Sequence, residues 1–239
     1  MLEAVTFDFW NTVMWEEPGS LRQRRLEVLP ELLGRDRIDE VALEKAHDAA
    51  HRAYEQAWLA GSQFTVEHAA ALISERLPSL SGGAPAVLVE GFCEAGRRAA
   101  VHPSDGIRDC LEELKAGGAR LGIVCDIGLT PAYVVRELLA RYGLLELFDD
   151  TAFSDEVGHY KPDRRIFEHA LAKLGGAAPD RSAHVGDRRR TDVAGAQAIG
   201  MTAVRYRRVY DDAGPGPEAE HVVDDLAEIP ALLGAGARA

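Results

Sequence analysis

From residue 101 onwards, helical segments alternate with short apolar strands, and this alternation limits the possible folds more than any other feature of the sequence. A strand of the same kind stands near the beginning of the chain. The apolar strands are predicted at 3–9, 119–125, 150–153, 182–186, 202–206 and 221–223. Strands joined by helices form βαβ units, whose strands lie parallel in one sheet with helices on both faces. The chain is therefore predicted to have an α/β fold with a doubly wound parallel sheet.

Residues 16–100, which lie between the first strand and the alternation, carry helix signals only. Polar residues suited to N-caps mark helix beginnings in this stretch, and Gly residues mark helix ends. Helices are predicted from Pro18 to Gly34, from Asp39 through Ala60, from Thr65 through Leu77 and over about 86–100, with a loop at Ser79–Pro85. We therefore predict a core domain formed by residues 1–15 and 101–239, with a helical domain inserted at 16–100.

Composition restricts the class of protein. The chain has 239 residues, of which 46% are hydrophobic, and this suits one core domain with a large insertion. Its net charge of −12 argues against nucleic-acid binding, which needs a basic surface. No apolar stretch is long enough to span a membrane and no secretory signal precedes the first strand, so we expect a cytoplasmic protein. The three cysteines form no metal-binding pair and are expected to be free thiols.

Residues that can carry chemistry stand where the predicted strands end. In chain order they are Asp8, Cys125, Asp126, Lys161 and Asp187. A single Asp in such a position is more often a helix cap than a nucleophile. The carboxyl ends of parallel strands, however, meet at one edge of the sheet, where ligands bind in open α/β folds. We therefore expect these side chains to lie close together and to form a site.

Four stretches of the sequence resemble the motifs of one enzyme family. They are Ala4–Val13 with Asp8 and Thr12, Leu121–Asp126, Ser154–Asp163 with Lys161 before a proline, and His184–Asp192, which reads Gly-Asp-x-x-x-x-Asp from Gly186. In this order and at these spacings they resemble the haloacid dehalogenase-like (HAD) hydrolases. The helical insertion resembles the C1-capped subclass of that family. The resemblance covers the whole chain and implies a Rossmann-like core with an inserted helical cap.

The resemblance also implies a role for each matching residue. Asp8 would be the nucleophile that forms an aspartyl-phosphate intermediate, and Lys161 would pair with it and with the transferring phosphoryl group. Mg²⁺ would be held by Asp8, Asp187, Asp192 and the backbone carbonyl of Trp10, since this ion prefers hard oxygen ligands. Without the resemblance, Lys161 would be read as a surface lysine and the two later aspartates as helix N-caps.

Trp10 departs from the family motif, which has a second Asp at this position. In the family that Asp protonates the leaving group and then activates water, and an indole does neither at neutral pH. General acid–base catalysis is worth about 10²–10⁴-fold in rate. Its loss leaves four interpretations open: a substrate with a good leaving group, a substrate that supplies its own proton relay, a reaction other than phosphate transfer, or a fold kept without catalysis.

The residues beside these motif positions are expected to contact the substrate. Asn11 stands where the family often has Gly, and Asn tolerates a left-handed backbone. Cys125 replaces a hydroxyl donor with a thiol, which is a weak donor, while backbone N–H groups at Asp126 remain available. A nucleophilic role for Cys125 is an alternative. The predicted substrate-binding residues are Trp10, Asn11, Thr12, Cys125 and Asp126.

Taken together, the sequence favours a Mg²⁺-dependent hydrolase that acts on a small phosphorylated metabolite. We expect a small-molecule anionic substrate, no nucleic-acid or membrane partner, and a monomer or homodimer. A metal-independent 2-haloacid dehalogenase would also use Asp8, but the retained pair Asp187 and Asp192 favours phosphate chemistry. A non-catalytic binding or regulatory module on the same fold is the third hypothesis. The run Arg188–Arg190 is either a solvated loop or a device that attracts an anionic substrate to an acidic protein.

Overall fold

The computed structural model describes residues 2–77, 80 and 84–234. Its strands are β1 (Ala4–Phe7), β2 (Met14–Glu16), β3 (Val101–Pro103), β4 (Arg120–Cys125), β5 (Asp150–Phe153), β6 (Ser182–Gly186), β7 (Thr202–Tyr206) and β8 (His221–Val223). Its α-helices are α1 (Ser20–Leu33), α2 (Glu40–Leu59), α3 (Val66–Arg76), α4 (Ala84–Arg98), α5 (Ile107–Ala116), α6 (Ala132–Arg141), α7 (Ser154–Val157), α8 (Arg164–Lys173), α9 (Ala194–Ala198) and α10 (Ile229–Leu232). Short 3₁₀ turns lie at Arg35–Arg37, Leu145–Leu147, Pro179–Arg181 and Leu226–Glu228, and a π-helical turn at Arg189–Val193.

Six of the strands form one parallel sheet in the order β5-β4-β1-β6-β7-β8. β1 lies in the middle, with Phe7 opposite Ile123 of β4 on one side and Val185 of β6 on the other. The strand order reverses at β1, because β4 and β5 extend the sheet to one side and β6 to β8 extend it to the other. The carboxyl ends of β1, β4 and β6 therefore meet at a topological switch point. The predicted doubly wound α/β fold is confirmed.

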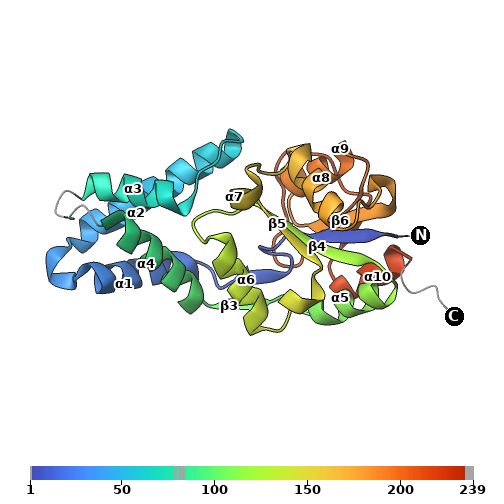
Figure 1. Ribbon diagram of the computed structural model, residues 1–239, viewed down its shortest axis with the longest axis horizontal. Helices are drawn as coiled ribbons and strands as arrows, with labels where there is room; N and C mark the ends of the chain where they lie inside the picture. Colours follow the sequence, from blue (N-terminus) through green and yellow to red (C-terminus); the bar gives the residue numbers. More distant parts are fainter. Residues whose placement is uncertain (1, 78–79, 81–83, 235–239) are drawn as a thin grey trace. The chain divides into compact units, whose positions relative to one another are not determined.

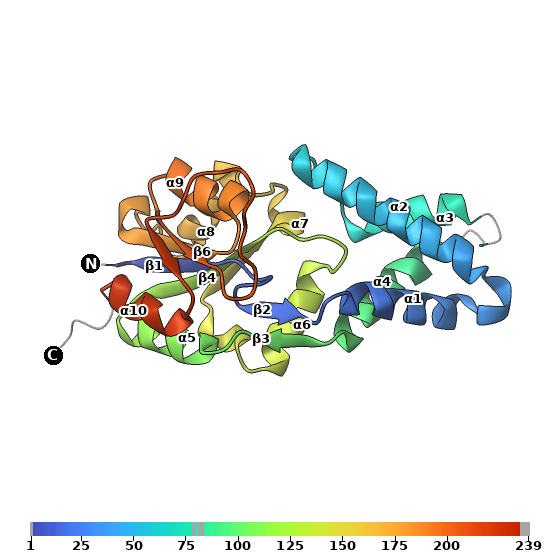
Figure 2. The same ribbon diagram turned by 180° about the vertical axis from the view of Figure 1, so that it is seen from behind.

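Helices cover both faces of this sheet. Figures 1 and 2 show α8 and α9 on one face and α5 and α10 on the other. Along α8 the buried side chains recur at the spacing of one helical face, with Ile166, Phe167, Ala170 and Leu171 turned inward. They join Val124 and other strand residues in one apolar cluster. All five residues of β6 are buried, as expected for a central strand covered on both faces.

The chain divides into two compact units. The α/β unit comprises Met1–Trp15, His102–Asp126 and Leu139–Ala239, and the helical unit comprises Glu16–Val101 and Ile127–Leu138. The helical unit has its own apolar core, in which Leu29, Leu43, Ile73 and Phe92 are fully or almost fully buried. The predicted domain bounds, with the insertion at 16–100, stay a prediction.

Helix caps fix the beginnings of two helices in the helical unit. The Asp39 carboxylate accepts hydrogen bonds from the backbone N–H groups of Val41 and Ala42, at 2.9 and 3.2 Å, and so begins α2. Thr65 and His68 form a reciprocal capping box that begins α3. Both beginnings are those predicted from the sequence.

A few elements differ from the prediction. β2 and β3 pair with each other in a separate two-stranded sheet, and neither was predicted. α7 is a single helical turn after β5 that was also not predicted. A π-helical turn that was not predicted precedes α9. The predicted loop Ser79–Pro85 lies mostly outside the described residues.

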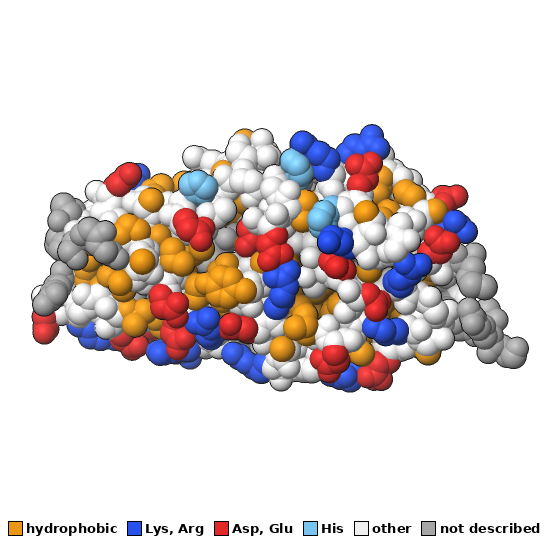
Figure 3. Space-filling view, in the orientation of Figure 1, with side chains coloured by type: hydrophobic (Ala, Val, Ile, Leu, Met, Phe, Trp, Pro, Cys, Tyr) orange, Lys and Arg blue, Asp and Glu red, His pale blue; other side chains and the backbone are white. Residues whose placement is uncertain are grey.

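The surface carries both signs of charge. Figure 3 shows acidic and basic side chains interspersed over one face of the molecule. Many of them form exposed ion pairs, such as Arg164 with Glu168 at 2.6 Å, which contribute little to stability. Among the residues that the structure describes, no helix is both long and apolar enough to cross a membrane.

Candidate active site

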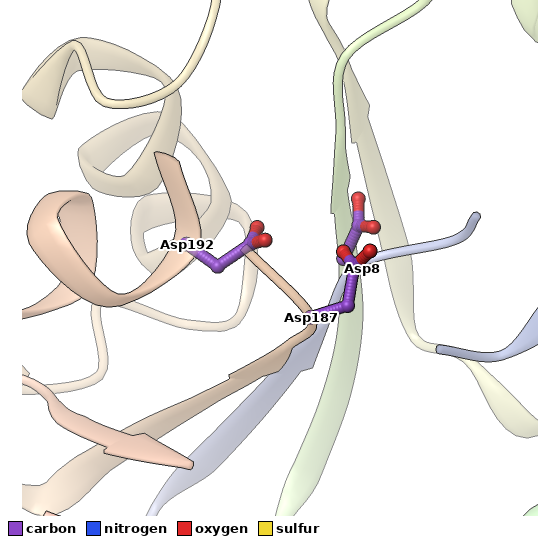
Figure 4. A group of neighbouring side chains, drawn as sticks. All are labelled: Asp8, Asp187 and Asp192. Carbon is purple, nitrogen blue, oxygen red and sulfur yellow. The ribbon is translucent and has the colours of Figure 1, made fainter. Parts of the chain in front are cut away.

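Three aspartates converge at the carboxyl edge of the central sheet. Asp8 directly follows β1, and Asp187 directly follows the neighbouring strand β6. Asp192 lies five residues further on, in the π-helical turn. One carboxylate oxygen from each of the three lies within 4.8 Å of the others, and all three residues are buried. Figure 4 shows the three side chains directed toward one another.

The backbone around the aspartates explains how they are held. The N–H of Asp8 donates to the carbonyl of Val185 at 2.8 Å, so the pairing of β1 with β6 continues one residue past the strand. The N–H of Arg188 donates to Oδ2 of Asp192 at 2.9 Å. Gly186 makes room for this carboxylate, because a Cβ at that position would lie 2.4 Å from the Asp192 Cγ. A π-helical turn such as this one is rare and is often found at functional sites.

Lys161 joins two of the three carboxylates. Its Nζ lies 2.5 Å from Oδ1 of Asp8 and 2.6 Å from Oδ1 of Asp192, and the side chain is only 3% exposed. Its backbone N–H donates to Oδ1 of Asp126 at 2.8 Å, which ties the loop before α8 to the end of β4. Although burial opposes the charge, Asp192 and Asp8 raise the pKa of Lys161 well above its ordinary value. The lysine is therefore a permanent cation in this cluster.

His184 completes the cluster, and sequence reasoning missed it. Its Nε2 lies 3.1 Å from Oδ1 of Asp192 and its Nδ1 lies 2.8 Å from the Thr6 hydroxyl. The Phe167 ring packs edge-on against the imidazole at 5.0 Å. Burial lowers the pKa of His184, so the ring is neutral at pH 7. A neutral imidazole that holds a neighbouring carboxylate in place is a positioning residue.

The cluster has more negative than positive groups. Burial raises the pKa of Asp187 well above its ordinary value, and the charges of Asp8 and Asp192 raise it further. Burial also raises the pKa of Asp8, although Lys161 opposes this. Burial opposes the ionisation of Asp192 too, yet Lys161 and His184 together lower its pKa. Two carboxylates are thus neutralised only in part by one ammonium group. The Arg188 charge opposes the rise in the pKa of Asp187, but it does not offset burial and the two neighbouring carboxylates.

These residues fit a hard divalent cation. Oδ1 of Asp187 is buried and has no hydrogen-bond partner among the described residues, so one carboxylate oxygen of the cluster is unused. A second positive ion would satisfy this oxygen and offset the repulsion that raises the pKa of Asp187. Three carboxylates without a nitrogen or sulfur ligand are the donor set that Mg²⁺ prefers.

The residues after Asp8 form a tight turn beside the cluster. Asn11 has a left-handed backbone with φ of 60°, the conformation that Asn tolerates, and its N–H donates to the Met14 carbonyl at 2.7 Å. Its side-chain amide donates to Oδ2 of Asp187 at 3.3 Å. The Trp10 indole packs edge-on against the Phe9 ring, with 4.7 Å between the ring centres. The hydroxyl of Thr12 is buried without a hydrogen-bond partner in the described part of the chain.

Cys125 and Asp126 lie at the end of the strand next to β1. The Cys125 thiol is buried and lies 3.4 Å from the carbonyl oxygen of Asp126. Burial raises the pKa of this thiol well above its ordinary value, and the charge of Asp8 raises it further. A thiol that stays protonated is a poor nucleophile. The geometry therefore disfavours the alternative in which Cys125 attacks the substrate.

Two of the three arginines between Asp187 and Asp192, Arg188 and Arg189, contact the segment 210–212. The Arg188 guanidinium is partly buried and stacks over the Tyr210 ring at 5.0 Å from its centre. The N–H of Arg189 donates to Oδ2 of Asp212 at 2.8 Å. These contacts tie the loop to residues 210–212. Burial opposes the charge of Arg188, but the nearby Asp187 carboxylate raises the pKa of this guanidinium above its ordinary value.

Comparison with known proteins agrees with this site. The sequence profile of a hydrolase family, the haloacid dehalogenase-like hydrolases, matches residues 2–200. A glyceraldehyde 3-phosphate phosphatase of Methanothermobacter thermautotrophicus is 34% identical over 144 residues, which make up 56% of this chain and 60% of that protein. The chain thus spans less than two thirds of the length of this relative.

Two solved structures resemble the whole chain. The HAD phosphatase of Thermococcus onnurineus has a TM-score of 0.65 and 26% sequence identity, covering 98% of this chain and 99% of that one. The 2-haloacid dehalogenase of Pseudomonas syringae pv. Tomato has a TM-score of 0.74 and 21% identity, covering 98% and 99%. The second likeness concerns the fold alone.

Proposed function

The chain belongs to the haloacid dehalogenase-like hydrolases, and from this premise we propose that it is a Mg²⁺-dependent phosphatase of small phosphorylated metabolites. One observation carries the proposal. Three buried carboxylates and Lys161 converge at the carboxyl edge of the sheet, and one oxygen of Asp187 is left without a partner. The carboxylates of such a cluster can bind a metal cation, and its lysine can bind an anionic substrate.

In this mechanism an oxygen of the Asp8 carboxylate attacks phosphorus, the bond between phosphorus and the ester oxygen breaks, and the leaving group departs as an anion, which leaves an aspartyl phosphate. Lys161 holds the attacking carboxylate through Oδ1 and offers positive charge to the phosphoryl group. Asp8, Asp187, Asp192 and the Trp10 carbonyl would hold Mg²⁺, which would supply positive charge for an anionic phosphate. His184 and the Arg188 N–H keep Asp192 in position for that ligand set. Water then releases phosphate from Asp8.

Trp10 determines which substrates this site can turn over. No carboxyl group stands two residues after Asp8, so the leaving oxygen receives no proton from that position. Substrates whose leaving group departs as a stable anion, such as acyl or aryl phosphates, suit this site best. Asn11, Thr12 and the backbone at Cys125 and Asp126 are proposed to hold the substrate phosphate.

The dehalogenase alternative is less well supported. A reaction that releases halide needs the Asp8 carboxylate but no metal. It leaves unexplained why a buried Asp187 is held beside two other carboxylates with an unused oxygen. A non-catalytic module would keep the cluster and would bind the metal without turnover.

A phosphate-release screen distinguishes the three hypotheses. The full chain is assayed against alkyl, aryl and acyl phosphates with Mg²⁺ and with EDTA, and halide release from 2-haloacids is measured in parallel. We expect Mg²⁺-dependent phosphate release that Asp8→Asn abolishes in a folded protein. The exposed Asp180→Asn variant is the matched control and should keep full activity. Halide release in EDTA would support the dehalogenase, and Mg²⁺ binding without any turnover would support the module.

A further inference from the structure

The helical unit buries an arginine that makes no direct ion pair with any described carboxylate. Arg25, on α1, is 6% exposed. Two other arginines on the same helix have close carboxylate partners: Arg22 lies 2.7 Å from Glu44, and Arg24 lies 2.7 Å from Glu27. No carboxylate among the described residues lies within 4.0 Å of the Arg25 guanidinium. The buried arginine is thus unpaired, while its exposed neighbours are paired.

The contacts of Arg25 leave part of its hydrogen-bonding capacity unused. Its Nη2 donates to the hydroxyl of Thr130 at 3.0 Å, and its guanidinium lies over the Phe92 ring at 5.3 Å from the centre. Its Nε is buried and has no acceptor within the described part of the chain. A guanidinium offers five N–H donors in a rigid fork that matches carboxylate and phosphate oxygens. Thr130 uses one of them.

Neighbouring groups offset only part of the cost of burying the Arg25 charge. The His47 imidazole stacks on Phe92 and is uncharged, because burial and then the charge of Arg25 lower its pKa to about 4. The Glu16 carboxylate accepts a hydrogen bond from the Leu21 N–H at 3.2 Å. Its charge acts on Arg25 from a distance and opposes the fall in the pKa of that guanidinium, but it does not offset the effect of burial. Burial lowers the pKa of Arg25 to about 10, so it remains charged at pH 7. A buried charge without a partner is costly, and native proteins rarely keep one without use.

We propose that Arg25 and Thr130 form an oxyanion-binding site in the helical unit, which takes a carboxylate or phosphate group. The oxyanion would accept from the unused Nε and complete the fork, and the Thr130 hydroxyl would fix the orientation of the guanidinium. All the residues involved belong to one compact unit, so the site does not depend on how the two units are arranged. The same chemistry has two sources: a second acidic group on the substrate or a separate free anion.

Binding is tested first, without turnover. The full chain is titrated with inorganic phosphate and with acetate, and the melting temperature and the Arg Nε–H resonances are followed. We expect Arg25→Met to weaken binding at least about tenfold, the loss of one charge-assisted hydrogen bond. Arg24→Met, which removes an exposed charge from the same helix, is the matched control and should bind as the wild type does. Without anion, Arg25→Met should melt no lower than the wild type, because it removes an unpaired buried charge.

Kinetics then identify the source of the anion. If the substrate supplies it, Arg25→Met raises KM at least about tenfold more for phosphate esters that bear a carboxylate than for p-nitrophenyl phosphate. If a free anion supplies it, acetate alters wild-type turnover of p-nitrophenyl phosphate but not that of Arg25→Met; acetate is used here because inorganic phosphate is also the product of the proposed reaction. Equal anion affinity in the two proteins, or a lower melting temperature of Arg25→Met without an anion effect, would overturn the proposal. The binding arm remains decisive even if no phosphatase activity is found.

Discussion

At the scale of single residues, the surroundings of Asp187 disfavour its negative charge, because the side chain is buried beside two other carboxylates. Burial and neighbouring charges raise the pKa of Asp187 in the folded protein. At a pH where the Asp187 carboxyl is ionised only in the unfolded chain, this lowers the stability of the fold, by about 1.4 kcal/mol for a tenfold change in the protonation equilibrium. Asp187→Asn removes this cost and keeps an oxygen toward Asn11. In EDTA we therefore expect Asp187→Asn to unfold at a higher temperature than the wild type.

With Mg²⁺ present, the wild type should unfold at a higher temperature than Asp187→Asn. A cation that binds the folded chain stabilises it in proportion to the logarithm of its concentration over Kd, and the variant lacks one anionic ligand. Calorimetry should show a large loss of Mg²⁺ affinity in Asp187→Asn and almost none in Cys125→Ser. An Asp187→Asn protein that is less stable in EDTA and binds Mg²⁺ normally would mean that the carboxylate is structural.

Trp10 gives the second prediction at this scale. Without a general acid, hydrolysis should depend steeply on the acidity of the leaving group, so that aryl and acyl phosphates react far faster than alkyl phosphates. Trp10→Asp should raise alkyl-phosphate turnover, with a ceiling of about 10²–10⁴-fold. Trp10→Asn, which removes the indole without adding an acid, is the control and should give no such gain. Equal wild-type rates on aryl and alkyl esters, with chemistry rate-limiting, would show that another group donates the proton.

A site residue could be predicted from the sequence only where its position relative to a strand or helix indicates its neighbours. Asp8 and Asp187 stand directly after apolar strands, and the carboxyl ends of neighbouring strands must meet, so their approach could be predicted. His184 lies inside a strand, where a polar residue gives no sign of its partner, and its contact with Asp192 depends on the π-helical turn. Arg25 has the same local pattern as its paired neighbours on α1. Only its packing against Phe92 of α4 and its hydrogen bond to Thr130 distinguish it.

At the scale of elements, the position of Asp192 in the π-helical turn depends on the close approach of this turn to the last residue of β6. A Cβ on Gly186 would lie 2.4 Å from Cγ of Asp192, so Gly186→Ala must displace that carboxylate. We expect a loss of about 1–3 kcal/mol in stability from overpacking, together with a marked loss of Mg²⁺ affinity. Calorimetry and urea unfolding measure the two effects separately.

Gly200→Ala is the control for this prediction. A Cβ there meets no atom within 4 Å, and its cost comes from the backbone φ of 85°. It should lower stability by about 1 kcal/mol and leave Mg²⁺ affinity unchanged. If Gly186→Ala behaves in the same way, Gly186 matters for the fold and not for the position of Asp192.

Elements with strong end signals were predicted, and elements without them were not. α2 begins after Asp39 and ends before Gly61 because a side-chain cap and a positive-φ glycine fix both ends. β2 and β3 have three residues each, too few to show an alternating pattern, and they form because they pair with each other. The π-helical turn at residues 189–193 was not predicted, because it carries no sequence signal of the kind that marks helix ends.

At the scale of the whole molecule, each compact unit buries one histidine that stays neutral. His184 lies in the α/β unit and His47 in the helical unit, and burial lowers the pKa of both. A buried neutral histidine makes folding less favourable in acid, because the unfolded chain takes up a proton that the folded chain refuses. His47 is the better probe, since it lies outside the carboxylate cluster and its substitution leaves that site intact.

The contribution of His47 to the free energy of unfolding should therefore fall as the pH is lowered from about 6.5, the ordinary histidine pKa, to about 4, the pKa of buried His47. In that window only the unfolded chain binds the proton, so its population rises. A shift of this size corresponds to up to about 3 kcal/mol. His47→Gln should flatten the profile of unfolding free energy against pH by that amount. His51→Gln, on the same helix and half-exposed, is the matched control, and the difference between the two variants isolates the burial of the imidazole. Parallel profiles for the two variants between pH 4 and 6.5 would show that His47 gains its proton as readily in the folded chain as in the unfolded one.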